Sequence, residues 1–142
     1  MHTAIHLFYL KTCPALKERT RLKSFLNTIF KREKKKFITL TYIFCSDQYL
    51  LQINREYLKH DFYTDIITFD LSEDPKIIEG EIYISIDRVR DNAKKQGVSI
   101  REELHRVIFH GVLHLCGYKD KRAEDKAKMT EAENKCLQLY FS

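Results

Sequence analysis

Alternating apolar positions predict several short β-strands. Every second residue between Phe37 and Phe44 is large and apolar, and the same alternation recurs from Glu81 to Ile86. Successive side chains of a strand point to opposite faces, so a period of two is typical of a strand with one buried face. Shorter apolar runs predict two more strands, at Ile5–Leu10 and Asp65–Leu71.

Apolar positions three and four residues apart predict helices between these strands. One helix is expected from Pro14 to about Lys34, with Pro14 in the first turn, where its missing N–H is not needed. Ser46 is a natural N-cap for a second helix. A polar surface helix is expected over Asp87–Gln96, and the capping box Ser99–Glu102 opens the next one. The last helix carries its apolar stripe at Met129, Ala132, Cys136 and Leu139.

The elements follow the order β-α-β-α-β-β-α-α-α. This order predicts an α+β, or mixed α/β, fold in which a small mixed sheet of about four strands is packed with helices. Polar stretches at 59–63 and at 72–80, which contains Pro75, are typical of loops inside one domain. We find no repeat or linker, so residues 1–142 are expected to form a single domain.

The composition is that of a folded protein without a membrane partner. The chain has 142 residues, of which 44% are hydrophobic and 32% are charged, enough for a core of its own. There is no apolar run of transmembrane length and no signal-peptide pattern, so we expect a cytoplasmic protein. The cysteines lack a C-x-x-C pair, which is typical of reduced and mostly buried thiols. They are Cys13, Cys45, Cys116 and Cys136.

The positive charge of the chain favours a polyanionic partner. The formal net charge is +5, and such an excess is common among proteins that bind nucleic acid. The densest basic run is Lys31–Lys36. Cations at the C-terminal end of a helix dipole explain this run at least as well as a binding patch does.

The residues with the clearest chemistry lie in the stretch Val107–Cys116. This stretch is apolar nearly all round, which indicates a buried helix, yet it contains His110 and His114. Residues four apart share one helix face, so both imidazoles can point at one spot. Gly117 suits the left-handed end of a helix, and Asp120 follows closely enough to offer a carboxylate. Two imidazoles and one carboxylate form a catalytic zinc shell, so we predict one zinc ion on His110, His114 and Asp120.

The other histidines have no partner at ligand spacing. His105 is five residues before His110 and therefore faces elsewhere on the helix. We expect His105, His2 and His6 to be structural or exposed to solvent, and His60 to lie in a loop.

The segment from His110 to Tyr118, with the sequence HGVLHLCGY, resembles a family signature. It is similar to the motif H-G-x-L-H-L-x-G-Y-D-H of the YbeY family of bacterial rRNA-maturation endoribonucleases. The strand Gly80–Ser85 resembles that family's G-D-I-x-I-S, and Met129 with Glu133 match its M-x-x-x-E. A further block is similar to its N-x-x-Y-R-x-x-D-x-x-T-D-V-L-S-F. The matching residues of that block are Asn54, Tyr57, Asp61, Thr64, Asp65, Ile66 and Phe69.

The resemblance implies a zinc-dependent, single-strand-specific endoribonuclease. Members of this family act in rRNA maturation, including that of the small-subunit 3′ end, and in ribosome assembly. The implied partners are rRNA precursors and the small ribosomal subunit or its assembly factors, and not DNA or a membrane. The implied fold places the zinc helix near its centre. For the general base the resemblance offers only Asp61 and Asp65 as candidates.

Two positions depart from the family pattern. Asp120 stands where the family has a third histidine ligand, and its carboxylate cancels one charge of the metal. A bound water should then be less acidic, and the optimum pH higher than in an Asp120→His variant. Leu58 stands where the family usually has arginine, a plausible clamp for the scissile phosphate. Nearby positive charges that could replace it, and bind RNA, are those of Arg55, Lys59, His60 and Lys119.

Two other functions fit parts of this pattern. Zincin metalloproteases use H-E-x-x-H with the glutamate as base, but Gly111 occupies that place here. A non-catalytic RNA-binding ribosome-assembly factor with a structural metal is the stronger alternative, since both Leu58 and Asp120 depart from the family. Structural zinc sites normally have four protein ligands. Only three ligands are evident here, which favours an open, catalytic position. Cys116 could be considered as a fourth ligand, but it lies two residues from His114, about 200° round the helix, and should point away from the metal.

Overall fold

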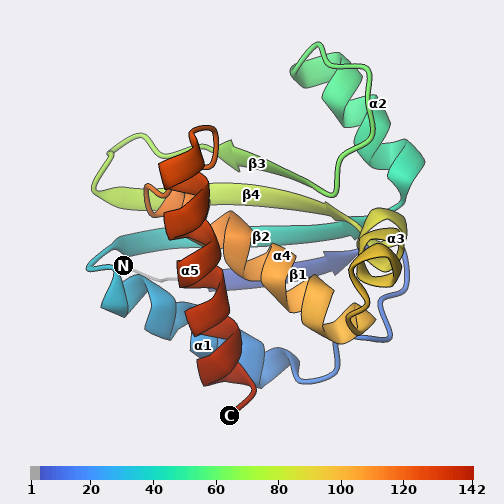
Figure 1. Ribbon diagram of the computed structural model, residues 1–142. Helices are drawn as coiled ribbons and strands as arrows, with labels where there is room; N and C mark the ends of the chain where they lie inside the picture. The colour runs from blue at the N-terminus through green and yellow to red at the C-terminus, as the bar shows by residue number, and fades with distance from the viewer. Residues whose placement is uncertain (1–3) are drawn as a thin grey trace.

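The computed structural model describes residues 4–142, and its elements follow the predicted order (Figure 1). The strands are β1 (Ala4–Tyr9), β2 (Lys36–Cys45), β3 (Ile66–Asp70) and β4 (Ile77–Ser85). The helices are α1 (Arg19–Arg32), α2 (Asp47–Tyr57), α3 (Ile86–Gln96), α4 (Ile100–Leu115) and α5 (Ala123–Tyr140). Within this described range, no helix has both the length and the apolar character needed to cross a membrane.

The four strands form one mixed sheet in the order β1-β2-β4-β3. β2 pairs in parallel with both β1 and β4, while the edge strand β3 runs antiparallel to β4. Parallel neighbours need long crossover connections, which are supplied here by α1 and by the segment that contains α2 and β3. This arrangement confirms the predicted α+β class with a mixed sheet of four strands.

The core lies between the sheet and the helices α1, α4 and α5 (Figure 1). The buried positions of β4, and those of β2 from Leu40 onward, alternate as predicted, and α4 lies at the centre of the helical layer. At the start of β2, Phe37 is buried in place of Ile38, because the strand pairing shifts its register between Phe37 and Thr39. The hydroxyl of Tyr42 in β2 donates a hydrogen bond of 2.7 Å to the carbonyl oxygen of Ile108 in α4. Gly111 lets α4 approach the sheet closely, because a Cβ there would lie 2.8 Å from Cδ1 of Ile82.

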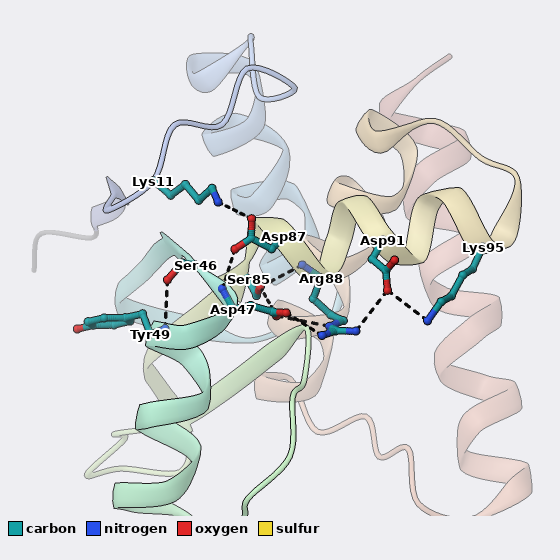
Figure 2. Close-up of polar contacts among 9 residues, drawn as sticks. All are labelled: Lys11, Ser46, Asp47, Tyr49, Ser85, Asp87, Arg88, Asp91 and Lys95. Carbon is teal, nitrogen blue, oxygen red and sulfur yellow. Dashed lines mark hydrogen bonds and ion pairs between the residues drawn. The ribbon is translucent and has the colours of Figure 1, made fainter.

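A network of polar side chains joins the first turns of α2 and α3 (Figure 2). The Asp47 carboxylate accepts hydrogen bonds from Ser85 Oγ at 2.8 Å and from the Arg88 guanidinium at 2.7 Å. The backbone N–H of Asp47 donates to Asp87 at 2.9 Å, and Lys11 also pairs with Asp87. The network fixes the orientation of α2, and therefore the start of the loop that leads from α2 into β3.

The predicted helix caps are confirmed. Ser46 Oγ accepts the N–H of Tyr49 at 3.1 Å, and Ser99 Oγ accepts the N–H of Glu102 at 3.0 Å. The predicted strand at Glu81–Ile86 is longer than expected, since β4 already begins at Ile77 and shortens the loop before it.

Two details of the predicted helices are wrong. α1 begins at Arg19 and not at Pro14, because the chain first turns so that Leu16 is buried and its N–H bonds to the carbonyl of Cys13 at 3.1 Å. On α5, Leu139 is exposed, because the buried stripe that passes through Met129 and Cys136 continues at Leu137 and Tyr140.

The four cysteines are free thiols, and all except Cys13 are buried, as predicted. Burial raises the pKa of the Cys45 and Cys116 thiols to about 12. Reactive cysteines depend on the thiolate form, so these thiols are structural.

Candidate active site

A cleft of about 380 Å³ opens between α4, α5 and the start of β3. Six of the side chains that line it are ionisable, and they come from four different parts of the chain. They are Asp65, Glu103, Arg106, His110, Asp120 and Glu133. Four of these six are carboxyl groups, so the cleft is strongly electronegative unless some of them are protonated or bind a cation.

Helix α4 supplies half of these side chains because of its periodicity. Glu103, Arg106 and His110 are spaced three and four residues apart, which places them on one face. The opposite positions of α4, such as Ile108 and Val112, are buried in the core and hold the helix in place.

His110 lies between two carboxylates. Its Nδ1 donates a hydrogen bond of 2.6 Å to Oε2 of Glu133 on α5, and its Nε2 lies 3.3 Å from Oδ2 of Asp120. Burial lowers the pKa of His110, but the hydrogen bond to Glu133 and the negative charges of Glu133, Asp120 and Asp65 outweigh it, so the pKa is raised. The position of Nε2 is thus one where positive charge is favoured.

Glu133 is itself held in place. It is buried, and its Oε1 accepts a hydrogen bond of 3.0 Å from the Arg106 guanidinium. The other end of that guanidinium donates to Oδ1 of Asn134 at 2.7 Å. Carboxylates that bind the outer nitrogen of a metal-ligating histidine orient the ring and fix its tautomer. Here Glu133 binds Nδ1 of His110 in this way, and Glu133 is in turn held by Arg106, which Asn134 also binds.

The structure brings together two of the three predicted metal ligands. His110 and Asp120 are neighbours, and Gly117 has the positive φ, +110°, that the predicted turn between them requires. His114 is exposed one helical turn beyond His110 and does not line the cleft. Among residues 4–142, no three histidine, cysteine, aspartate or glutamate side chains are grouped as a metal site. The zinc site on His110, His114 and Asp120 therefore stays a prediction.

The two candidate bases differ in their position. Asp65 lines the cleft, where burial raises the pKa of its carboxyl group, and Asn92 Nδ2 lies 3.5 Å from its Oδ2. Asp61 is exposed, forms an ion pair with Arg55 and lies outside the cleft.

The predicted RNA-binding residues lie outside the cleft. Arg55 is engaged by Asp61, and Lys59 and His60 are exposed in the loop after α2. Lys119 is next to Asp120 but lines a separate hollow beyond the end of α4. None of these four side chains lines the cleft, and their role in binding RNA stays a prediction.

Three side chains of the cleft were given no role by the sequence analysis. Arg106 is the one lysine or arginine of the cleft lining within the described part of the chain. Glu103 and Arg106 precede His110 by seven and four residues, so the helical period that paired His110 with His114 also points to them. Glu133 matched the family motif, but its contact with His110 depends on how α5 packs against α4.

The remaining histidines are structural or exposed, as predicted. His105 is buried, its Nδ1 donates to the carbonyl of Arg101 at 2.7 Å, and its ring stacks on Tyr140. His6 is exposed on β1 and His60 lies in a loop. His2 lies outside the described residues. Cys116 is buried at the end of α4, away from the cleft, as expected.

A family model and several similar proteins agree on one family. The family model described as "Endoribonuclease YbeY" matches residues 11–140. The endoribonuclease YbeY of Cytophaga hutchinsonii is 56% identical over 124 residues, which is 87% of each chain. That of Parabacteroides distasonis is 45% identical over 126 residues, 89% of this chain and 87% of the relative. The solution structure of TM1509 from Thermotoga maritima has a TM-score of 0.71 and 27% identity, covering 97% of this chain and 89% of that one.

Proposed function

This chain belongs to the endoribonuclease YbeY family, and on that basis we propose that it cleaves single-stranded rRNA precursors with one bound zinc ion. The predicted family is thereby confirmed, and with it the class of RNA-cleaving hydrolase. In this proposal residues 1–142 act as one endoribonuclease-like domain in the cytoplasm. Its substrate is the precursor of the small-subunit 3′ end, and its partners are the small ribosomal subunit or assembly factors.

The observation that carries the proposal is His110 held between Glu133 and Asp120 in a carboxylate-rich cleft. RNA is a polyanion, and a cleft with four carboxyl groups and one guanidinium repels its phosphates. A divalent cation offsets most of this negative charge and so weakens the repulsion. The electrostatics of the cleft therefore support a metal-dependent reaction over RNA binding by side chains alone.

The side chains near His110 fit a zinc ion chemically. His110 Nε2 and the Asp120 carboxylate are 3.3 Å apart in the cleft and would hold the ion. His114 is the proposed third ligand, and its exposed side chain would have to turn toward them from the next turn of α4. Glu133 would orient the ring of His110 from its far side. When bound, the ion would supply Lewis-acid stabilisation of charge that develops on the phosphoryl oxygens and activate the attacking oxygen.

Arg106 is the cationic side chain best placed to contact the scissile phosphate. A guanidinium has five N–H donors, and Glu133 and Asn134 engage one nitrogen each. Donors remain for a phosphate oxygen. Arg106 would thus supply inside the cleft the positive charge that the family usually has at the position of Leu58.

Metal content and cleavage, measured together, test the proposal. Wild-type protein should contain about one zinc ion per chain and cleave a labelled single-stranded RNA that carries the small-subunit 3′ precursor. His110→Ala and Asp120→Ala should lose both properties, while His6→Ala, an exposed histidine on β1, should keep them.

Other outcomes would redirect the proposal. Full retention of zinc by both His110→Ala and Asp120→Ala would show that the metal binds elsewhere. Zinc binding with RNA binding but no cleavage would favour the assembly-factor alternative.

A further inference from the structure

Glu103 is a buried carboxyl group that none of the contacts described above uses. It lies on α4, is only 4% exposed, and lines the same cleft as His110 and Asp120. Its Oε1 is inaccessible to solvent and lacks a hydrogen-bond partner among residues 4–142. A buried polar oxygen without a partner costs stability, so its retention at this place calls for a functional reason.

The surroundings of Glu103 favour its neutral form. Burial is the main cause, and negative charges add to it from Asp65 ahead of β3, from Glu133 on α5 and from Glu102 on α4. Arg106 opposes them but is already paired with Glu133. Together these groups raise the pKa of Glu103 to about 7, where a carboxyl group can both take up and release a proton at neutral pH.

The position of Glu103 relative to His110 fits a role in proton transfer better than a role in metal binding. Seven residues of helix separate the two by about 10 Å along the axis, on the same face. Glu103 therefore lines the same cleft as His110 and Asp120, with its Cα two helical turns from that of His110.

The other two carboxyl candidates are less suited to exchange a proton. Asp61 is exposed, paired with Arg55 and outside the cleft. Asp65 lines the cleft, but backbone N–H groups of Asp65 and Ile66 favour its ionised form and Asn92 lies beside it. Glu103 has no such donors among the described residues.

We propose that Glu103 is the catalytic residue that transfers the proton during RNA cleavage. The proposal rests on the function proposed above. The Glu103 carboxylate takes the proton of the attacking hydroxyl, from water or from the RNA 2′ position, as its oxygen bonds to phosphorus. O5′ leaves on the opposite side of phosphorus and takes a proton from water as its bond to phosphorus breaks, and the Glu103 carboxylic acid then returns its proton to solvent. Glu103 ends as a carboxylate, and no other reactant is needed.

The test compares Glu103→Gln with the wild type in single-turnover cleavage of a labelled single-stranded RNA by zinc-loaded protein. Glutamine has the same shape but cannot accept this proton, so cleavage should slow at least about 100-fold. Zinc content and RNA affinity should not change. Glu102→Gln, at the neighbouring exposed position, is the matched control and should cleave at the wild-type rate.

Two further measurements separate proton transfer from a structural role. The wild-type rate should fall on the acidic side with the pKa of Glu103, and this dependence should disappear in Glu103→Gln. Carbon NMR of the side-chain carboxyl groups of metal-free protein should show one glutamate titrating near neutral pH that Glu103→Gln removes. Glu103→Asp, which keeps the carboxyl group, should retain the acidic limb at a reduced rate, and it serves if Glu103→Gln does not fold.

Each opposite result has a distinct meaning. Equal cleavage by Glu103→Gln and wild type, or an ordinary glutamate pKa at this position, overturns the proposal for Glu103 alone. Loss of zinc from Glu103→Gln also overturns it, because Glu103 would then be a metal ligand. Absence of cleavage by the zinc-loaded wild type overturns the proposed function, and the role of Glu103 with it.

Discussion

Replacing Glu103 with glutamine should stabilise the metal-free protein, and the gain should grow with pH. In the unfolded chain a glutamate ionises at its usual pKa of 4.5, whereas in the fold Glu103 stays protonated up to about 7. Between these values the folded state binds more protons than the unfolded state. A rise in pH through this window therefore favours unfolding and lowers the free energy of unfolding.

The size of the effect follows from the two pKa values. The difference between 4.5 and about 7, at roughly 1.4 kcal/mol per pH unit, gives a cost of about 3 kcal/mol above neutral pH. Most of this cost develops between pH 5 and pH 8, where it amounts to about 2 to 3 kcal/mol. Glutamine keeps the shape of the side chain without the charge, so Glu103→Gln should not lose this unfolding free energy as the pH rises.

Urea unfolding of wild type and Glu103→Gln at pH 5 and pH 8 measures this difference directly. The advantage of the variant should be about 2 to 3 kcal/mol larger at pH 8. Glu102→Gln should show no such increase, because Glu102 is exposed. The reasoning fails if the difference between Glu103→Gln and wild type is the same at both pH values, or if the variant is less stable at pH 8.

Three further predictions concern the contacts around His110. Glu133→Gln should weaken zinc binding about 10- to 100-fold in a chelator competition, because a neutral amide holds the ring of His110 less firmly; unchanged affinity would contradict this role. Gly111→Ala should lower the free energy of unfolding by about 1 to 3 kcal/mol, because its Cβ would lie 2.8 Å from Cδ1 of Ile82. An unaltered urea midpoint would show that Ile82 and the sheet move to accommodate the added Cβ. Asp120→His should lower the optimum pH of cleavage, since imidazole leaves the metal charge uncancelled, and an unshifted pH–rate profile would refute this.

Elements set by local pattern could be predicted from the sequence. The alternation in β2 from Leu40 onward and the serine caps of α2 and α4 depend on neighbouring residues, and all three are confirmed. The start of α1 was not predictable in this way. Pro14 suits a first helical turn, but the burial of Leu16 against the core decides the conformation before Arg19.

In the candidate site, too, some contacts follow from local sequence and others depend on how distant helices pack. Helical spacing and a turn at Gly117 were enough to place Asp120 beside His110. The bond from His110 to Glu133 joins residues 23 positions apart, on two helices whose packing the sequence does not specify locally. Helical spacing also gives the face on which His114 lies, but not the conformation of its side chain.

The bond from Glu133 to His110 also sets the order in which the site can form during synthesis. The ribosome makes α4 first, so His110 and both other predicted ligands leave the ribosome before Glu133 does. Until α5 has been made and has packed against α4, the His110 ring lacks the partner that orients it. A nascent chain is therefore an incomplete nuclease until α5 has emerged from the ribosome, the particle whose RNA is its proposed substrate. Truncation within α5 should impair the site in the same way, although every predicted ligand is present.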